Sequence, residues 1–340
     1  MNATMSLEKK AHFPVMLDQI LSIITPRHGG TFIDCTFGGG GYSKAILEHS
    51  ETRVIAFDRD KSAENFSNTL SKKYGSRFTF FNEKFSNLSS HIRQNINNKA
   101  IIFDLGFSLS QVKSLDRGFS FESKYPLDMR MGMNKFSAYE VLNTLNKCQI
   151  SDILKYYGDE KDHKKIASKI IQTRKNKKIL NTNDLVTIIK NAKGNKKFVK
   201  KNVATKSFQA IRIFVNNEVS ELVKGLIEAT KLLNPGGLLI VVSFHSLEDK
   251  IVKHFFKTYS EKKKNPSRYL PILDKEDTRL FDCPEKKPLN PSRKEISINY
   301  PSRSAKLRYG IRNNKKYFFP NELVKKFKNY LDIEKIGLSL

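Results

Sequence analysis

Residues 31–43 read TFIDCTFGGGGYS, and this stretch decides the fold. An apolar, β-prone run at 31–33 ends at Asp34, and four consecutive glycines at 38–41 precede a helix-like segment that begins at Tyr42. Glycine has no Cβ, so the backbone can adopt positive φ and approach a ligand closely. The stretch therefore predicts a strand, a tight turn and a helix, with a nucleotide-like cofactor at the turn. A glycine-rich surface loop is the alternative.

A second apolar run, VIAFDRD at 54–60, ends in acids about 20 residues beyond the glycines. In doubly wound folds the acid at the end of the second strand binds the hydroxyls of an adenosine ribose. We predict that Asp58 has this role. Asp60 is predicted to cap the helix that follows at 61–73.

Two further strands are predicted at 78–81 and 100–107, the second again carrying an acid, Asp104, behind a buried apolar run. Three strands would then deliver Asp34, Asp58 and Asp104 to their carboxyl ends. Open α/β sheets bind their ligands at this edge. The pattern predicts an α/β protein with a Rossmann-like, doubly wound core.

The pattern changes between about residues 109 and 204, where a turn-rich segment precedes amphipathic helices with many lysines. We predict a discontinuous core, residues 1–108 and 205–340, interrupted by a mostly helical insertion at 109–204 that recognises the substrate. The lysines are either a solvated helix surface or a nucleic-acid contact.

The α/β pattern resumes with a long predicted helix that Ser207 would cap, a Pro-Gly-Gly turn at 235–237 and a fifth strand at 238–244. His245 or Ser246 would cap the next helix. Nearer the C-terminus, segments 295–300 and 304–311 are predicted to form an antiparallel pair. A basic helix is predicted at 321–331.

The composition favours a polyanionic partner. Lys and Arg number 61 against 34 Asp and Glu, a net charge of +27 in 340 residues, and clustered cations release counterions from phosphates. Compositional drift toward lysine could produce part of this excess. Three scattered cysteines without a C-x-x-C pair argue against disulfides and a zinc site. No apolar run reaches the roughly 18 residues of a spanning helix, so we expect a cytoplasmic protein without membrane contact or metal.

The glycine spacing separates two cofactor classes. Dehydrogenases usually have G-x-G-x-x-G with a pyrophosphate on the helix N-terminus. Here the glycines are contiguous and a Pro-Gly-Gly turn precedes the fifth strand. Both features resemble class I methyltransferases, so S-adenosyl-L-methionine is the favoured cofactor and a dinucleotide oxidoreductase is disfavoured.

Within that class, longer motifs are similar to the bacterial 16S rRNA (cytosine-N4)-methyltransferase family, known as RsmH or MraW. They are DCTFGGGGYS, AFDRD, DLGFSLSQ, RGFSF, PLDMRM, FQAIRIFVNNE, SFHSLED and RSAKLR. The resemblance implies methylation of a cytidine in the decoding region of the small ribosomal subunit. The family commonly has His, Val and Pro where this chain has Tyr42, Phe107 and Ser110. The cofactor residues implied by matching motif are Gly38, Gly40, Gly41, Tyr42, Asp58, Phe85, Asp104 and Gln111.

The implied reaction requires acceptors for a weakly nucleophilic amine, whose lone pair is delocalised into the cytosine ring. We predict that Asp104 and the backbone carbonyls beside it orient this amine. Phe107 would stack on the extruded base or merely pack under the insertion. His245 is a second candidate, either hydrogen-bonding or accepting a proton, with a helix cap as its alternative role.

Two other possibilities stay open from the sequence. A non-enzymatic RNA-binding or ribosome assembly factor could retain this fold, and both a monomer and a homodimer are compatible with the chain.

Overall fold

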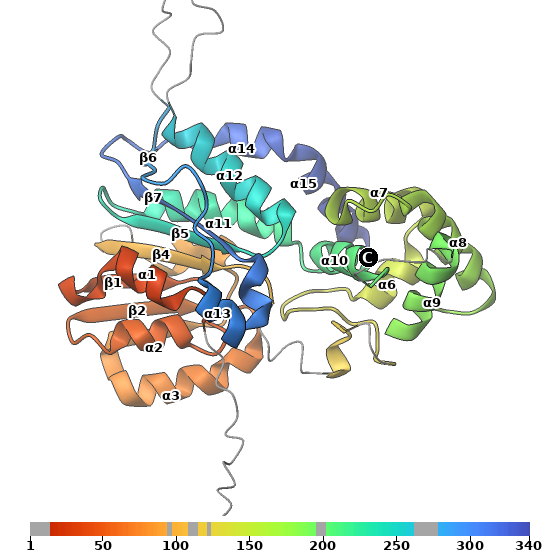
Figure 1. Cartoon of the computed structure of the whole chain (residues 1–340), viewed down its shortest axis with the longest axis horizontal. Helices are drawn as coiled ribbons and strands as arrows, with labels where there is room; N and C mark the ends of the chain where they lie inside the picture. The colour runs from red at the N-terminus through yellow and green to blue at the C-terminus, as the bar shows by residue number, and fades with distance from the viewer. Residues whose placement is uncertain (1–13, 94–96, 108–114, 121–123, 195–201, 262–277) are drawn as a thin grey trace, which may run out of the picture.

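The computed structural model describes residues 14–93, 97–107, 115–120, 124–194, 202–261 and 278–340. Its centre is a seven-stranded sheet in the order β3-β2-β1-β4-β5-β7-β6 (Figure 1). The strands β1 to β5 run parallel, and β7 is antiparallel to both β5 and β6. The strands are β1 (Gly30–Asp34), β2 (Thr52–Phe57), β3 (Phe78–Phe81), β4 (Asn98–Asp104), β5 (Leu238–Ser243), β6 (Phe281–Asp282) and β7 (Lys306–Arg312).

Helices cover both faces of the sheet, because alternate residues of its buried strands point to opposite sides. Phe32 packs with α1 (Leu17–Ile24), α2 (Gly41–Leu47) and α3 (Glu64–Tyr74). Ile33 packs on the other side, in the cluster that also holds residues of three further helices. These are α4 (Leu88–His91), α11 (Glu218–Leu232) and α12 (Ser246–Ser260). The predicted doubly wound α/β core is confirmed.

The strand order reverses between β1 and β4, which is where such sheets bind ligands. Asp34 is in register with Ala56 of β2 and Ile102 of β4, while Asp104 is in register with Val242 of β5. The carboxyl ends of β1, β2, β4 and β5 therefore meet at one edge.

A layer of helices lies beside this edge (Figure 1). Three of them begin with capping boxes, at Ser137, Asn146 and Asn181, which satisfy their first backbone N–H groups. The helices of this layer include α6 (Ala138–Thr144), α7 (Lys147–Gly158), α8 (His163–Asn176) and α9 (Thr182–Lys193). The capping boxes belong to α6, α7 and α9. The helix α10 (Thr205–Val215) packs against α6 and α7, so it lies with the inserted helices although the predicted core begins at residue 205.

Two sequence predictions are wrong. The long helix from Ser207 is two helices, α10 and α11, with Ala204 rather than Ser207 as the first cap. The break is at Asn217, whose φ of 49° is left-handed, a conformation that asparagine tolerates. The segment predicted to pair as a strand at 295–300 is largely α13 (Arg293–Ile298), because the Ser292 hydroxyl caps it by accepting from the Glu295 N–H at 3.1 Å.

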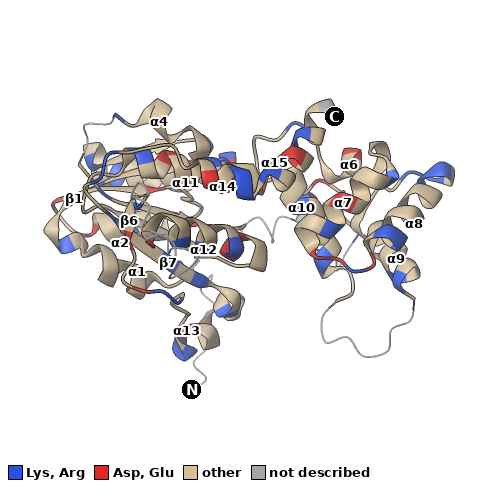
Figure 2. Ribbon diagram, turned by 90° about the horizontal axis from the view of Figure 1, so that it is seen from above, with Lys and Arg blue, Asp and Glu red and all other residues tan. Residues whose placement is uncertain are grey.

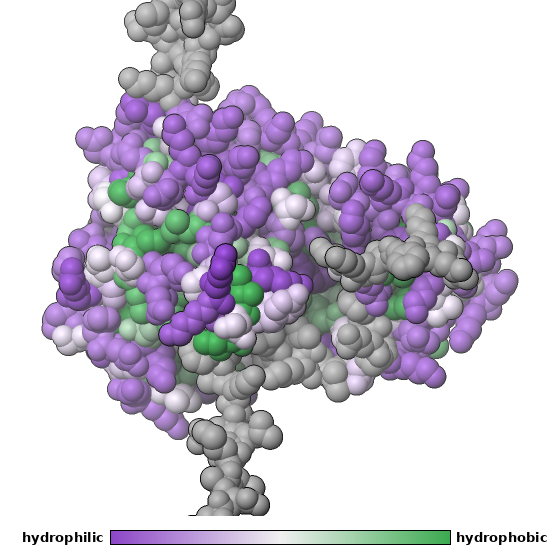
Figure 3. All heavy atoms as spheres, in the orientation of Figure 1, coloured by the Kyte–Doolittle hydropathy of each residue, from purple (hydrophilic) through white to green (hydrophobic). Residues whose placement is uncertain are grey.

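The C-terminal region returns to the core. The basic helix predicted at 321–331 is two helices separated at Phe327, α14 (Asn321–Lys326) and α15 (Lys328–Lys335). Lys and Arg lie on many helices, including α8, α9 and α14 (Figure 2). The face in Figure 3 is mostly hydrophilic, with small apolar patches. None of the helices in the described ranges is long and apolar enough to cross a membrane.

Candidate active site

The glycine turn after β1 requires glycine at specific positions. Gly38 and Gly40 have φ of 52° and 76°, which other residues rarely adopt. A Cβ on Gly40 would lie 2.8 Å from Phe37 Cζ, and one on Gly41 would lie 2.8 Å from Pro14 Cγ. The turn is therefore tightly packed as well as left-handed. The predicted strand, tight turn and helix are therefore confirmed, and a close backbone approach to a ligand stays a prediction.

Asp34 stabilises this turn from beneath. It is fully buried, and its carboxylate accepts from the Thr36 N–H at 3.2 Å and the Ser43 hydroxyl at 2.7 Å. Burial raises the pKa of Asp34 to about 6. Thr36 in turn accepts from the Asp104 N–H at 2.7 Å, which ties the end of β4 to the turn after β1.

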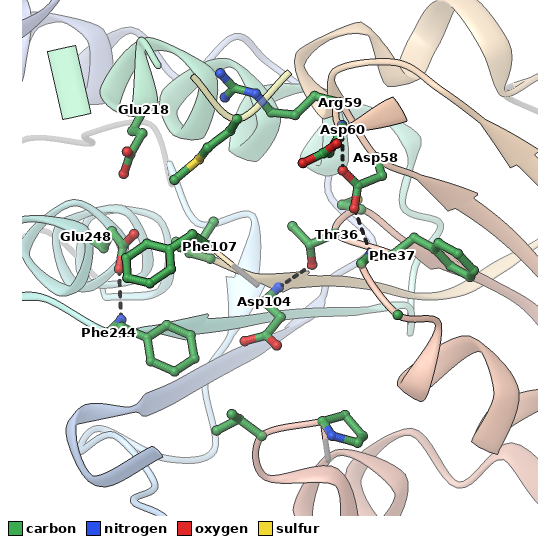
Figure 4. A pocket seen from close by; sticks show the side chains of 18 of the residues that line it. Thr36, Phe37, Asp58, Arg59, Asp60, Asp104, Phe107, Glu218, Phe244 and Glu248 are labelled. Atoms are coloured by element: carbon green, nitrogen blue, oxygen red, sulfur yellow. Dashed lines mark hydrogen bonds between the residues drawn. The ribbon is translucent and has the colours of Figure 1, made fainter. Parts of the chain in front are cut away.

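Asp58 directly follows β2 and lines a cavity at this edge of the sheet (Figure 4). Its Oδ2 accepts from the Gly38 N–H at 2.6 Å, and its Oδ1 accepts from the Asp60 N–H at 2.8 Å. Each oxygen retains a second lone pair for a ligand. Burial raises the pKa of Asp58 to about 6. Asp60 caps the next turn by accepting from the Ser62 N–H at 3.0 Å, as predicted.

Tyr42 and Asp104 form the centre of the cavity. The Tyr42 hydroxyl hydrogen-bonds to the Val15 carbonyl and lies 3.3 Å from Asp104 Oδ2. The other oxygen, Asp104 Oδ1, is buried and has no hydrogen-bond partner among the described residues. Burial raises the pKa of Asp104 well above its usual range. An unpaired buried acceptor in a cavity is costly unless a ligand donates to it.

Phe85 supplies an apolar wall. Its ring is 9% exposed and packs edge-on against Phe103, with centroids 5.1 Å apart. The helix α11 approaches Phe85 through Gly225, where an added Cβ would lie 2.5 Å from Phe85 Cδ2. Gln111, the remaining predicted cofactor residue, lies outside the described residues.

His245 lies on the substrate side and is also a helix cap. It occupies the N-cap position of α12, as the structural alternative predicted, and its backbone N–H donates to Glu248 Oε2 at 3.3 Å. Its Nε2 lies 3.1 Å from Glu248 Oε1 and 3.9 Å from Glu218 Oε2. Burial alone would lower the pKa of His245, but Glu248 and Glu218 together raise it to about 9. The capping contact to Nδ1 is long, 3.4 Å, so we give more weight to the carboxylates and assign an imidazolium. At neutral pH His245 is then a donor rather than a proton acceptor.

An ion pair that was not predicted from the sequence lies beside His245. Arg212 donates through Nε and Nη2 to the two oxygens of Glu218, both at 2.8 Å. Burial alone would raise the pKa of Glu218, but Arg212 and His245 lower it to about 2. The signal was an arginine among apolar residues of α10, six positions before an acid, but the helix break that brings the two together was not recognised.

Phe107 lies beside this pair. The Arg212 guanidinium stands 4.8 Å over its ring, and the Phe119 ring stacks at 5.8 Å. The ring is still 43% exposed and lines the cavity. Packing against the insertion is therefore observed, and stacking on a base stays a prediction.

These residues line a cavity of about 470 Å³, within the range of about 300–1,000 Å³ typical of ligand sites. It brings together Gly38, Gly41, Tyr42, Asp58, Phe85, Asp104 and His245. Carboxylates at the strand ends suit a cationic ligand, and the unpaired Asp104 Oδ1 suits a donor such as an amine. The site thus fits S-adenosylmethionine, which carries a sulfonium and no pyrophosphate.

One group of side chains also has a geometry that could hold a metal ion. Ligand atoms of Glu218, His245 and Glu248 lie within 4.8 Å of one another. Arg212, however, already binds both oxygens of Glu218. We assign the group as an ion-pair network, and the absence of a metal stays a prediction.

The doubly wound sheet with its antiparallel seventh strand, and the acidic cavity at the glycine turn, define a class I methyltransferase that uses S-adenosylmethionine. The comparison with known sequences is more specific. The MraW methylase family matches residues 9–312, and this chain belongs to that family.

Curated relatives agree with this assignment. A protein of Rickettsia canadensis named ribosomal RNA small subunit methyltransferase H is 42% identical over 303 residues, which cover 88% of this chain and 97% of the relative. A protein of the same name in Anaplasma phagocytophilum is 41% identical over 304 residues, with the same coverage of both chains. An rRNA methylase structure from Streptococcus thermophilus aligns at 12% identity with a TM-score of 0.38 over 86% of this chain and 96% of its own.

Proposed function

We propose that this methyltransferase modifies the exocyclic N4 of a cytidine in the 16S rRNA of the small ribosomal subunit. The names of its relatives, ribosomal RNA small subunit methyltransferase H, support an rRNA substrate. A net charge of +27 suits a polyanionic partner. A ribosomal substrate also supports a cytoplasmic location.

The observation that carries the proposal is the buried, unpaired Asp104 Oδ1 at the end of β4. The cytosine N4 is a poor nucleophile, because its lone pair is delocalised into the ring. An acceptor for one of its N–H groups favours a pyramidal nitrogen with a directed lone pair. Tyr42 holds Asp104 from the opposite side at Oδ2, so Oδ1 is left for the amine.

Bound S-adenosylmethionine supplies an electrophilic methyl group on a sulfonium. The N4 lone pair would take up this methyl group as the S–C bond breaks, S-adenosylhomocysteine would leave, and N4 would then lose a proton. Asp104 Oδ1, which would accept the hydrogen bond of the amine, is placed to take that proton. Most of the acceleration would come from proximity and alignment.

The residues on the other side of the site orient the substrate and do not accept its proton. His245 is held as an imidazolium by the nearby carboxylates of Glu248 and Glu218, so it places a positive charge in the substrate wall. Arg212 supports the Phe107 ring at the same wall, where an extruded base could stack. These assignments leave Asp104 as the proton acceptor.

We also propose that the inserted helices recognise the RNA. They lie beside the carboxyl edge of the sheet, and α8 and α9 carry lysines on their surface (Figures 1 and 2). The packing of α10 against α6 and α7 supports counting α10 with this unit. We therefore propose a core in two parts and an inserted unit that consists of residues 109–204 together with α10.

The test compares the wild type with Asp104→Asn, which keeps the shape of the side chain and removes its basic oxygen. With labelled S-adenosylmethionine and unmodified small subunits, kcat should fall by about 100-fold or more, the range for loss of a general base. Asp18→Ala, an exposed acid on α1, should not change kcat. Near-normal transfer by Asp104→Asn would refute the assigned role. A wild type that binds subunits but transfers no methyl group would instead support the assembly-factor alternative.

A further inference from the structure

The family match ends at residue 312, yet residues 313–340 form two more helices and a final turn that pack closely on the rest of the chain. Leu323 and Phe327 are almost fully buried. The Leu323 N–H donates to the Tyr259 hydroxyl at 3.3 Å, and the Phe327 ring meets His254 edge-on at 5.7 Å. Both partners belong to α12, so α14 is anchored on the methyltransferase core.

The same segment then reaches the inserted helices (Figure 1). Tyr330 on α15 accepts at its carbonyl from the Tyr157 hydroxyl of α7 at 2.6 Å. The Lys250 ammonium of α12 donates to the Tyr330 hydroxyl at 3.2 Å. Further along, a Cβ on Gly337 would lie 2.5 Å from Phe136 Cζ, so the final turn lies directly against the part of the insertion just before α6. Residues 313–340 therefore connect the core to the insertion.

Glu334 makes the most specific contact. It is 5% exposed, and its carboxylate accepts from the Val219 N–H at 3.0 Å and the Ser220 N–H at 2.8 Å. These are the first turn of α11, where backbone N–H groups lack intrahelical partners. The local cap, Asn217, is left-handed and makes no side-chain capping bond. An acid more than a hundred residues away thus caps α11.

This cap lies next to the substrate wall. The residue before Val219 is Glu218, whose carboxylate binds Arg212 and lies 3.9 Å from His245 Nε2. The direction of the first turn of α11 sets the position of Glu218, because that turn carries its Cα. Fraying of this turn would move the Glu218 carboxylate, with Arg212 and His245, and leave the glycine turn of the cofactor site unchanged.

We propose that residues 313–340 are a C-terminal clasp that orders the substrate wall, with Glu334 as a positioning residue for Glu218. The kinetic part of this inference rests on the proposed function. The structural part, the cap on α11, does not.

The experiment uses the full chain with Glu334→Ala, Glu334→Gln and the control Glu322→Gln, an exposed acid on α14 that binds only Lys325 among the described contacts. Hydrogen exchange at amides 219–221 should rise by roughly 2- to 30-fold in Glu334→Ala, the range for a lost cap. Glu334→Gln keeps one acceptor oxygen, so its exchange should be intermediate. If Glu334→Ala does not fold, the exchange rates of Glu334→Gln still test the cap.

The kinetic readout separates positioning from general destabilisation. In Glu334→Ala, kcat with small subunits should fall or their KM should rise by about 10-fold. The calorimetric Kd for S-adenosylmethionine should change by a smaller factor than the subunit kinetics, because this turn reaches the predicted cofactor residues indirectly, through Glu221, which accepts from the Ser86 N–H at 3.0 Å. We expect Glu334→Gln to recover part of the loss.

Two results would overturn the clasp. One is a Glu334→Ala variant that matches Glu322→Gln in both exchange and kinetics. The other is an equal loss of cofactor and subunit affinity, which indicates a purely structural role. A wild type without methyl transfer would count against the proposed function alone, since the exchange measurement still tests the cap.

Discussion

Asp58 shows how one carboxylate can shape a site and bind in it. Its two oxygens accept from Gly38 and Asp60, so it fixes the glycine turn and the start of the next helix at once. The remaining lone pairs face the cavity, where a ribose would donate its hydroxyls. Removing the side chain would therefore remove the predicted ligand contact as well as a support of the turn.

We predict that Asp58→Ala weakens S-adenosylmethionine binding by about 1–3 kcal/mol, or roughly 5- to 150-fold, because ribose hydroxyls lose a partner. Isothermal calorimetry measures this directly, and Asp18→Ala should bind like the wild type. An unchanged Kd for Asp58→Ala would mean that the ribose is bound elsewhere.

His245 gives a prediction about pH and stability. Its pKa is raised from 6.5 to about 9 by Glu248 and Glu218, against the opposing effects of burial and of Arg212. A raised folded pKa contributes stability that is fully present below pH 6.5 and is lost as the pH rises through 9. The free energy of unfolding should decrease over this window by up to about 1.4 kcal/mol per pH unit for this one proton.

His245→Asn is the matched variant, because asparagine also caps helices but does not titrate. Denaturant unfolding of both proteins at pH 6, 7.5 and 9 would isolate the contribution of His245, since other titrating groups are shared. Parallel stability profiles would contradict the assignment of an imidazolium.

The strands, turns and caps that were predicted correctly from the sequence are those determined by neighbouring residues. The strands β1, β2 and β4 are apolar runs that end in acids, and the glycine turn requires its glycines. The predicted cap at Asp60 is likewise local. Because parallel strands bring their carboxyl ends to one edge, these signals were enough to gather most of the cofactor residues.

The break between α10 and α11 depends instead on distant contacts, so it was missed. Asn216 accepts at Oδ1 from the Met131 N–H at 2.8 Å, and its Nδ2 donates to the Met129 carbonyl at 2.7 Å. These partners are more than 80 residues away in sequence. The apolar period continues through the break, which is why one helix was predicted. The Arg212–Glu218 pair and the cap by Glu334 were missed with it.

The close approach of α11 to Phe85 leads to a prediction for Gly225→Ala. Alanine at an ordinary helix position would stabilise the protein by about 0.5–1 kcal/mol. Here the new Cβ would overlap Phe85 and approach Phe103 to 3.2 Å, so we expect a loss of about 1–3 kcal/mol in unfolding free energy. Displacement of Phe85 should also weaken cofactor binding.

Denaturant unfolding and calorimetry would measure both effects. Lys224→Ala, at the exposed neighbouring position of α11, controls for helix propensity. A Gly225→Ala protein that is more stable than the wild type and binds the cofactor equally well would show that Phe85 does not form the wall described.

At the scale of the whole molecule, the site depends on parts that are far apart in the sequence. The sheet supplies Asp58 and Asp104, while α10, α11 and α12 supply the opposite wall. Segment 299–304 also reaches the cavity, and the C-terminal helices contact α7 and α11 behind the second wall. In the proposed function, the methyl donor would lie in this cavity beside the inserted helices, and an RNA nucleotide would enter between them.

The central claim is methyl transfer to cytidine N4 in 16S rRNA, and mapping the modified nucleotide tests it most directly. The protein is incubated with methyl-labelled S-adenosylmethionine and small subunits that lack the modification, and the rRNA is digested and analysed by mass spectrometry. We expect label on N4 of one cytidine in the 16S decoding region. Label on another atom or base, on ribosomal protein, or nowhere would contradict it.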